Sequence, residues 1–187
     1  MSGDWADFDS FTSSPGADQA MMFGFAAMAQ NWNGQLGAAA TDAASVWGVT
    51  GDFSAKFSGL SIFASVAYQH YDMGDNAIDN INPWGFVGQV GYSLNDEWEL
   101  FGRMSWANNR GLNDPNVGTA LAADAKLTLL TIGANYFIND NVKFTADWGL
   151  NMNDTLGGIW TTQAATGWRQ TNASNEWVLR AQLQLLF

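Results

Sequence analysis

The last eleven residues of the chain, Trp177-Val178-Leu179-Arg180-Ala181-Gln182-Leu183-Gln184-Leu185-Leu186-Phe187, alternate between apolar and polar side chains. Every odd-numbered position is apolar, whereas Arg180, Gln182 and Gln184 occupy even-numbered positions. Because successive side chains of a β-strand point to opposite faces, this stretch predicts a strand with one face suited to lipid and the other to water.

The same alternation recurs along the rest of the chain and predicts about eight strands, each near the roughly 9–11 residues that a tilted membrane strand requires. The predicted fold is therefore all-β: a transmembrane, antiparallel, up-and-down β-barrel. The pattern is clear in residues 47–57, 98–106 and 142–152, weaker in residues 62–71, 84–94 and 127–138, and weakest in residues 21–30, where both faces are apolar.

Short and long connections alternate between these segments. Short turns with hairpin chemistry are expected at Ser58-Gly59, Asn95-Asp96 and Asn139-Asp140-Asn141. Outer-membrane barrels have short turns on the periplasmic side and long loops outside, so both ends of the strand set should lie on the periplasmic side. The long polar loops are expected at about residues 31–43, 72–83, 108–124 and 153–174.

The composition of the 187 residues fits a barrel wall. Hydrophobic residues make up 47%, yet no apolar run approaches the roughly 18 residues of a membrane helix. With Lys+Arg 7 against Asp+Glu 18 and a formal net charge of −11, the chain is a poor candidate for binding nucleic acid. Cys 0 excludes disulfides, thiolate catalysis and cysteine-based zinc sites.

Met1 is followed by Ser2-Gly3-Asp4-Trp5, without the basic and apolar regions of a secretory signal. Because an outer-membrane protein needs such a signal, we expect the chain to be part of a longer product. Residues 1–19 would form an N-terminal periplasmic segment or truncated lead-in, and residues 20–187 the barrel strands with their turns and loops.

Aromatic residues stand at both ends of several predicted strands. Trp98 and Trp106 are eight positions apart on one face, or about 26 Å along a strand, which places one indole near each boundary of the apolar band. The alternative, an aromatic core inside a soluble β-sandwich, would not need aromatics at both strand ends. The predicted girdle, in contact with outer-membrane lipid, comprises Trp47, Phe57, Trp84, Tyr92, Trp98, Trp106, Tyr136, Trp148, Trp177 and Phe187.

The end of the chain resembles the C-terminal strand by which outer-membrane barrels are delivered to the barrel-assembly machinery. Such machinery can capture a free strand edge by strand addition while reading alternate apolar side chains. The predicted assembly signal consists of Leu179, Ala181, Leu183, Leu185 and Phe187.

Charged residues are expected on the opposite, lumen-facing side of the wall. On three strands an acid and a base lie four positions apart, about 13 Å, which is too far for an ion pair within the strand. These charges must therefore interact with neighbouring strands or with water. Two interpretations remain open: a transverse field in a water-filled pore that tunes ion selectivity, or mutual neutralisation inside a narrow barrel. The predicted lumen-facing charges are Asp52, Lys56, Glu99, Arg103, Lys143, Asp147 and Arg180.

Three local stretches resemble the porin O and P family of outer-membrane channels, often described as phosphate-selective: residues 11–16, Phe-Thr-Ser-Ser-Pro-Gly; residues 132–139, Ile-Gly-Ala-Asn-Tyr-Phe-Ile-Asn; and the closing strand. The resemblance implies a 16-stranded, usually homotrimeric channel of which this chain is about the C-terminal half. The family's anion selectivity relies on many Lys and Arg residues, which are few here, so no phosphate-binding residue is assigned.

The sequence leaves two main hypotheses: a general porin for passive diffusion of small hydrophilic solutes, and a complete eight-stranded, plugged barrel that acts as an anchor or adhesin. Pairing of residues 21–30 with residues 177–187 would indicate the second. An enzyme is not expected, because the single histidine, His70 near Asp72, falls on the outward face by parity. We also expect no cofactor and no metal: acidic clusters such as Asp72, Asp75 and Asp79 match no defined cation loop.

Overall fold

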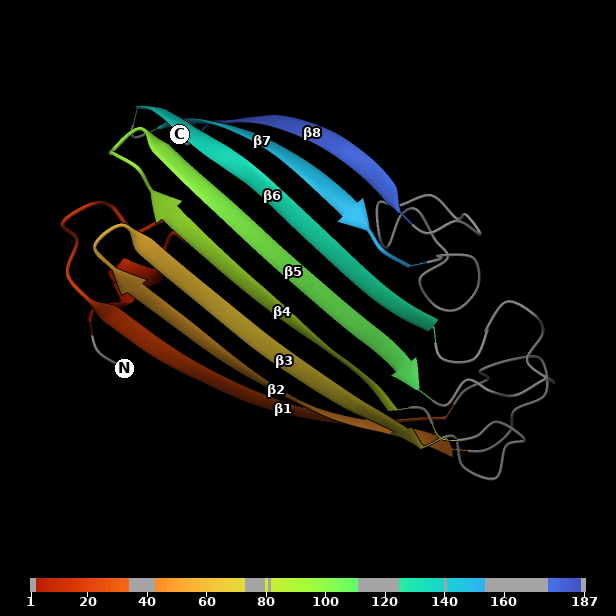
Figure 1. Ribbon diagram of the computed structural model, residues 1–187. Coiled ribbons are helices and arrows are strands. Elements are labelled where there is room, and N and C mark those ends of the chain that lie inside the picture. Colours follow the sequence, from red (N-terminus) through yellow and green to blue (C-terminus); the bar gives the residue numbers. More distant parts are fainter. Residues whose placement is uncertain are drawn as a thin grey trace.

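A computed structural model describes residues 3–33, 43–72, 80, 82–110, 125–139, 141–153 and 175–185. They form one eight-stranded antiparallel sheet in which every strand pairs with its neighbours in chain order (Figure 1). This confirms the predicted all-β, up-and-down fold. The elements are η1 (Trp5–Phe8), β1 (Ala20–Asn33), β2 (Ala43–Phe57), β3 (Leu60–Asp72), β4 (Asn82–Ser93), β5 (Trp98–Arg110), β6 (Ala125–Asn139), β7 (Val142–Asn151) and β8 (Glu176–Leu185).

Several strands are longer than their apolar alternation predicts. β2 and β6 each contain 15 residues, and β1 continues to Asn33 rather than stopping near Gln30. The alternation marks only the part of a strand that meets the apolar band, whereas backbone pairing continues into the polar rim. Strand length was therefore underestimated where the rim is polar.

The three short connections lie between the strands for which they were predicted, and two of them show a local cause. Ser58 and Gly59 both have positive φ values, 32° and 95°, as a two-residue type I′ hairpin requires. In the β4–β5 connection, the side-chain oxygen of Asn95 accepts hydrogen bonds from the backbone N–H groups of Glu97 and Trp98 at 2.9 and 2.8 Å. We call this end of the sheet the turn end and the opposite end the loop end.

The strand register divides the side chains between two faces. Cross-strand partners share a face, as Phe53 and Ala64 do on one side and Asp52 and Ser65 do on the other. We call the face of Phe53 the outer face and the face of Asp52 the inner face. No second layer of described residues covers the outer face, which excludes the β-sandwich interpretation for this part of the chain.

The indole side chains that would form the core of a soluble β-sandwich are instead exposed. Trp47, Trp98 and Trp177 are 45%, 42% and 62% exposed, and Phe25 on β1 reaches 79%. Such large apolar surfaces are rare on soluble proteins and mark contact with a membrane or a partner. Within the described residues, no helix is both long and apolar enough to cross a membrane.

The sheet is open: β1 and β8 are its two edges, and the described residues of these strands do not pair with each other. Figure 1 shows the sheet twisting and curving between these edges. The closed eight-stranded barrel considered from the sequence is therefore not formed by the described part of the chain.

Candidate channel wall

All seven charges predicted to face the lumen share the inner face, because the register pairs each with an inner-face partner. They are distributed over four strands. Asp52 and Lys56 lie on β2, Glu99 and Arg103 on β5, Lys143 and Asp147 on β7, and Arg180 on β8.

The arginines of the inner face bond to neighbouring strands. Nε and a terminal nitrogen of Arg180 lie 2.8 and 2.6 Å from Oδ1 of Asp147 on β7. The Arg180 side chain is 50% exposed, so this ion pair contributes only about 0–1 kcal/mol to stability. Arg103 donates from Nε to Oε1 of Gln89 on β4 at 2.7 Å, a partner that carries no charge.

Glu99 differs from the two arginines because it is buried, with 3% of its surface exposed. Its Oε2 accepts hydrogen bonds from Asn135 Nδ2 at 2.6 Å and from Thr12 Oγ1 at 3.0 Å. Thr145 on β7 extends this chain by donating to Asn135 Oδ1 at 2.6 Å. A buried carboxylate needs such donors, since the loss of water around it would otherwise be costly.

A glycine makes room for that carboxylate. A Cβ atom at position 91 would lie 2.6 Å from both Glu99 Oε1 and Ser61 Oγ, so only a residue without a side chain lets Glu99 lie across β4. Lys56 on β2 is also nearly buried, 8% exposed, and the carboxylates of Asp7, Glu99 and Asp9 interact with its charge.

The outer face carries nine of the ten predicted girdle residues in two rows. The turn-end row comprises Phe57, Tyr92, Trp98 and Tyr136, and towards the loop end lie Trp47, Trp84, Trp106, Trp148 and Trp177. Neighbouring rings contact each other within the rows: Trp98 and Tyr136 are 4.7 Å apart between centroids, and Trp84 and Trp106 are 4.3 Å apart. The tenth residue, Phe187, lies outside the described residues.

The predicted assembly signal lies on an edge strand. Leu179, Ala181, Leu183 and Leu185 of β8 all face outwards and, among the described residues, pair with β7 alone. The three leucines are at least half exposed. The last member, Phe187, again lies outside the described part of the chain.

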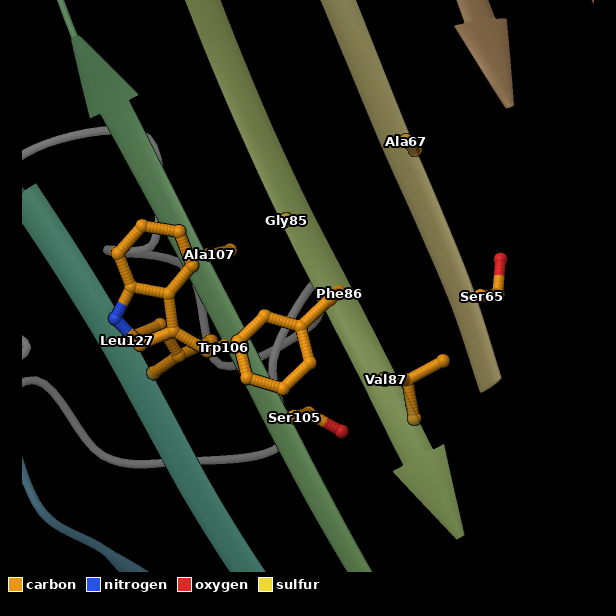
Figure 2. A pocket seen from close by; sticks show the side chains of 9 residues that line it. All are labelled: Ser65, Ala67, Gly85, Phe86, Val87, Ser105, Trp106, Ala107 and Leu127. Carbon is orange, nitrogen blue, oxygen red and sulfur yellow. The ribbon is translucent and has the colours of Figure 1, made fainter. Parts of the chain in front are cut away.

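A hollow that the sequence did not reveal lies across β3 to β6, with a volume of about 260 Å³ (Figure 2). Its inner-face residues are small or apolar. Three of the four strands, β3, β4 and β6, alternate weakly because apolar residues also occupy inner positions, and that weakness was a signal that could have predicted the hollow. The lining consists of Ser65, Ala67, Gly85, Phe86, Val87, Ser105, Trp106, Ala107 and Leu127.

The chemistry-bearing side chains do not converge on this hollow. His70 lies on the outer face opposite Trp47, with Nδ1 2.7 Å from Asn82 Oδ1. Among the described residues, no group of three or more His, Cys, Asp or Glu side chains could hold a metal ion. Of the acidic cluster considered above, Asp75 and Asp79 lie outside the described residues.

Comparisons with known proteins agree with this geometry. The sequence model of a family described as phosphate-selective porin O and P matches residues 26–184. The fold is similar to that of OmpT, an outer membrane protein of Vibrio cholerae folded in vitro, with a TM-score of 0.52 and 16% sequence identity. That match covers 92% of this chain but 51% of OmpT, so the chain spans about half of its length. No curated protein matches the sequence.

Proposed function

The chain belongs to the phosphate-selective porin O and P family of the bacterial outer membrane, and from this membership we propose a channel function. The chain forms part of the wall of a channel for passive diffusion of small hydrophilic solutes or ions. The separation of side chains by the register supports this proposal most directly. Seven charges share the inner face, while nine of the predicted girdle aromatics and the exposed leucines of β8 share the outer face. A membrane wall that encloses water requires this division.

The chain would supply about half of the barrel. An open edge in lipid leaves backbone N–H and C=O groups without partners, at a cost of several kcal/mol each, so β1 and β8 need neighbouring strands. The family resemblance indicates 16 strands in total and a homotrimer of such barrels. Eight strands leave an interior just wide enough for side chains, whereas about 16 leave an aqueous channel.

The inner face favours general diffusion over a dedicated anion site. Acidic and basic groups alternate along it, Asp147 and Arg180 neutralise each other, and Arg103 binds a neutral amide. A phosphate site would need several convergent cationic donors. We therefore assign no phosphate-binding residue in this chain.

The edge strand β8 also supports a role in assembly. Its outward leucines, and the side of the strand that no described strand pairs with, present the edge and the alternate side chains that strand addition requires. We propose that the barrel-assembly machinery recognises Leu179, Ala181, Leu183, Leu185 and Phe187.

The channel is tested with the purified full-length protein in planar lipid bilayers. Stepwise conductance increments are expected, together with liposome swelling rates that fall as the solute grows. Heat-denatured protein in the same detergent serves as the control. Folded protein, identified by heat-modifiable gel mobility and protease resistance, that gives neither steps nor swelling would refute the channel.

A further inference from the structure

The segment before β1 is bound to the inner face at the turn end. We call residues 4–19 the strap. Its short helix η1 lies beside the turn ends of the strands in Figure 1. Within η1, Asp7 Oδ2 accepts a hydrogen bond from the Asp4 backbone N–H at 2.7 Å, which holds the acidic start of the strap in a fixed shape.

The centre of the strap is fastened by Ser13, which is 1% exposed. Its Oγ accepts a hydrogen bond from the Gly59 N–H at 3.2 Å, and its carbonyl oxygen accepts one from Ser93 Oγ at 2.7 Å. Gly16 donates its N–H to Ser58 Oγ at 2.8 Å. The strap is thus bound to the β2–β3 turn and to the end of β4.

Two further contacts extend the attachment across the inner face. Thr12 donates to the buried carboxylate of Glu99 on β5, and the Phe11 ring meets the Phe63 ring of β3 edge-on at 5.3 Å. Both wall residues belong to the inner face. The strap therefore lies against the inner face of the sheet and not against the outer face.

The strap is also strongly acidic. It contains Asp4, Asp7, Asp9 and Asp18 and has no lysine or arginine. All four aspartates are exposed. Asp7 and Asp9 interact with the charge of the almost buried Lys56, and Glu99 interacts with the same charge.

We propose that the strap permanently narrows the turn-end mouth of the channel and makes that mouth favour cations over anions. The proposal rests on the proposed channel function and concerns which ions pass. Chain folded against the inner face occupies part of the cross-section. Exposed carboxylates in that narrowed section raise the local concentration of cations.

Charge selectivity provides the first test. Asp7→Asn with Asp9→Asn should lower the permeability ratio of K⁺ to Cl⁻ roughly twofold at low ionic strength, where charges act over about 10 Å or more. The ratio is obtained from the reversal potential of the full-length channel in a KCl gradient. Asp96→Asn, an exposed acid in the β4–β5 turn, is the matched control and should leave the ratio unchanged.

Accessibility of the strap provides the second test. The chain contains no cysteine, so Asp9→Cys adds the chain's single thiol, which a methanethiosulfonate carrying a trimethylammonium group can modify. Modification should reduce K⁺ conductance in single channels, whereas modification of Asp96→Cys should not.

The two proposals fail in different ways. A wild-type protein without conductance steps would refute the channel itself. If the wild-type channel conducts, the Asp7→Asn, Asp9→Asn variant has the same permeability ratio, and the reagent does not change the current of the Asp9→Cys variant, the strap proposal is overturned. The channel proposal then still stands.

Discussion

The inner face is built differently at its two ends. At the turn end, polar side chains are buried and bonded to one another beneath the strap, as Ser13, Ser93 and Glu99 show. Towards the loop end, small apolar residues such as Ala67 and Ala107 border the hollow (Figure 2). A substitution at the turn end should therefore cost stability, because each polar group depends on another. A substitution at the hollow should change the width of the passage instead.

The largest effect is expected where a side chain would displace Glu99. Gly91→Ala places a Cβ against Glu99 Oε1 and Ser61 Oγ. The carboxylate must then move away from Asn135 and Thr12, which should lower the free energy of unfolding by about 2 kcal/mol. Urea unfolding in detergent micelles, followed by tryptophan fluorescence, measures the difference.

Gly88→Ala in the same strand is the matched control for that prediction. A Cβ there meets no atom within 4 Å, so stability should stay the same or rise by up to about 0.5 kcal/mol. Equal effects of the two substitutions would mean that the turn end is no more tightly packed than the rest of the wall.

A bulky side chain at the hollow should affect conductance and not stability. Ala67→Trp adds a ring on the inner face of β3, where the exposed alanine leaves room for it. Single-channel conductance should fall by some tens of per cent. The free energy of unfolding, measured in urea, should change by no more than about 0.5 kcal/mol, as for ordinary surface substitutions.

The control for the hollow uses the other face of the same strand. Ala64 is exposed on the outer face of β3, so Ala64→Trp adds the same ring towards lipid. Its conductance should equal that of the wild type. A fall of similar size in both variants would show that the inner face does not border the passage.

The contrast between the two ends also shows what the sequence could reveal. Alternation predicted which side chains share a face on the strands where the pattern is clear, and Ser58-Gly59 marked its turn, because both signals are local. The contact of Ser13 with Gly59 and Ser93 spans 46 and 80 residues and follows no period, so it was not predicted. The hollow was missed for another reason: on β3, β4 and β6, its apolar inner positions weaken the pattern by which those strands were found.

The smallest effect is expected at the ion pair of β7 and β8, which belongs to neither end. Asp147 and Arg180 lie midway along their strands, and the arginine is half exposed. In a double-mutant cycle of Asp147→Ala and Arg180→Ala, the coupling free energy should be below about 1 kcal/mol and should shrink in high salt. A water-filled interior screens such a pair. Removal of one partner from a buried pair costs about 3–5 kcal/mol, so a coupling of that size would show that the wall beside β8 is as dry as the turn end under the strap.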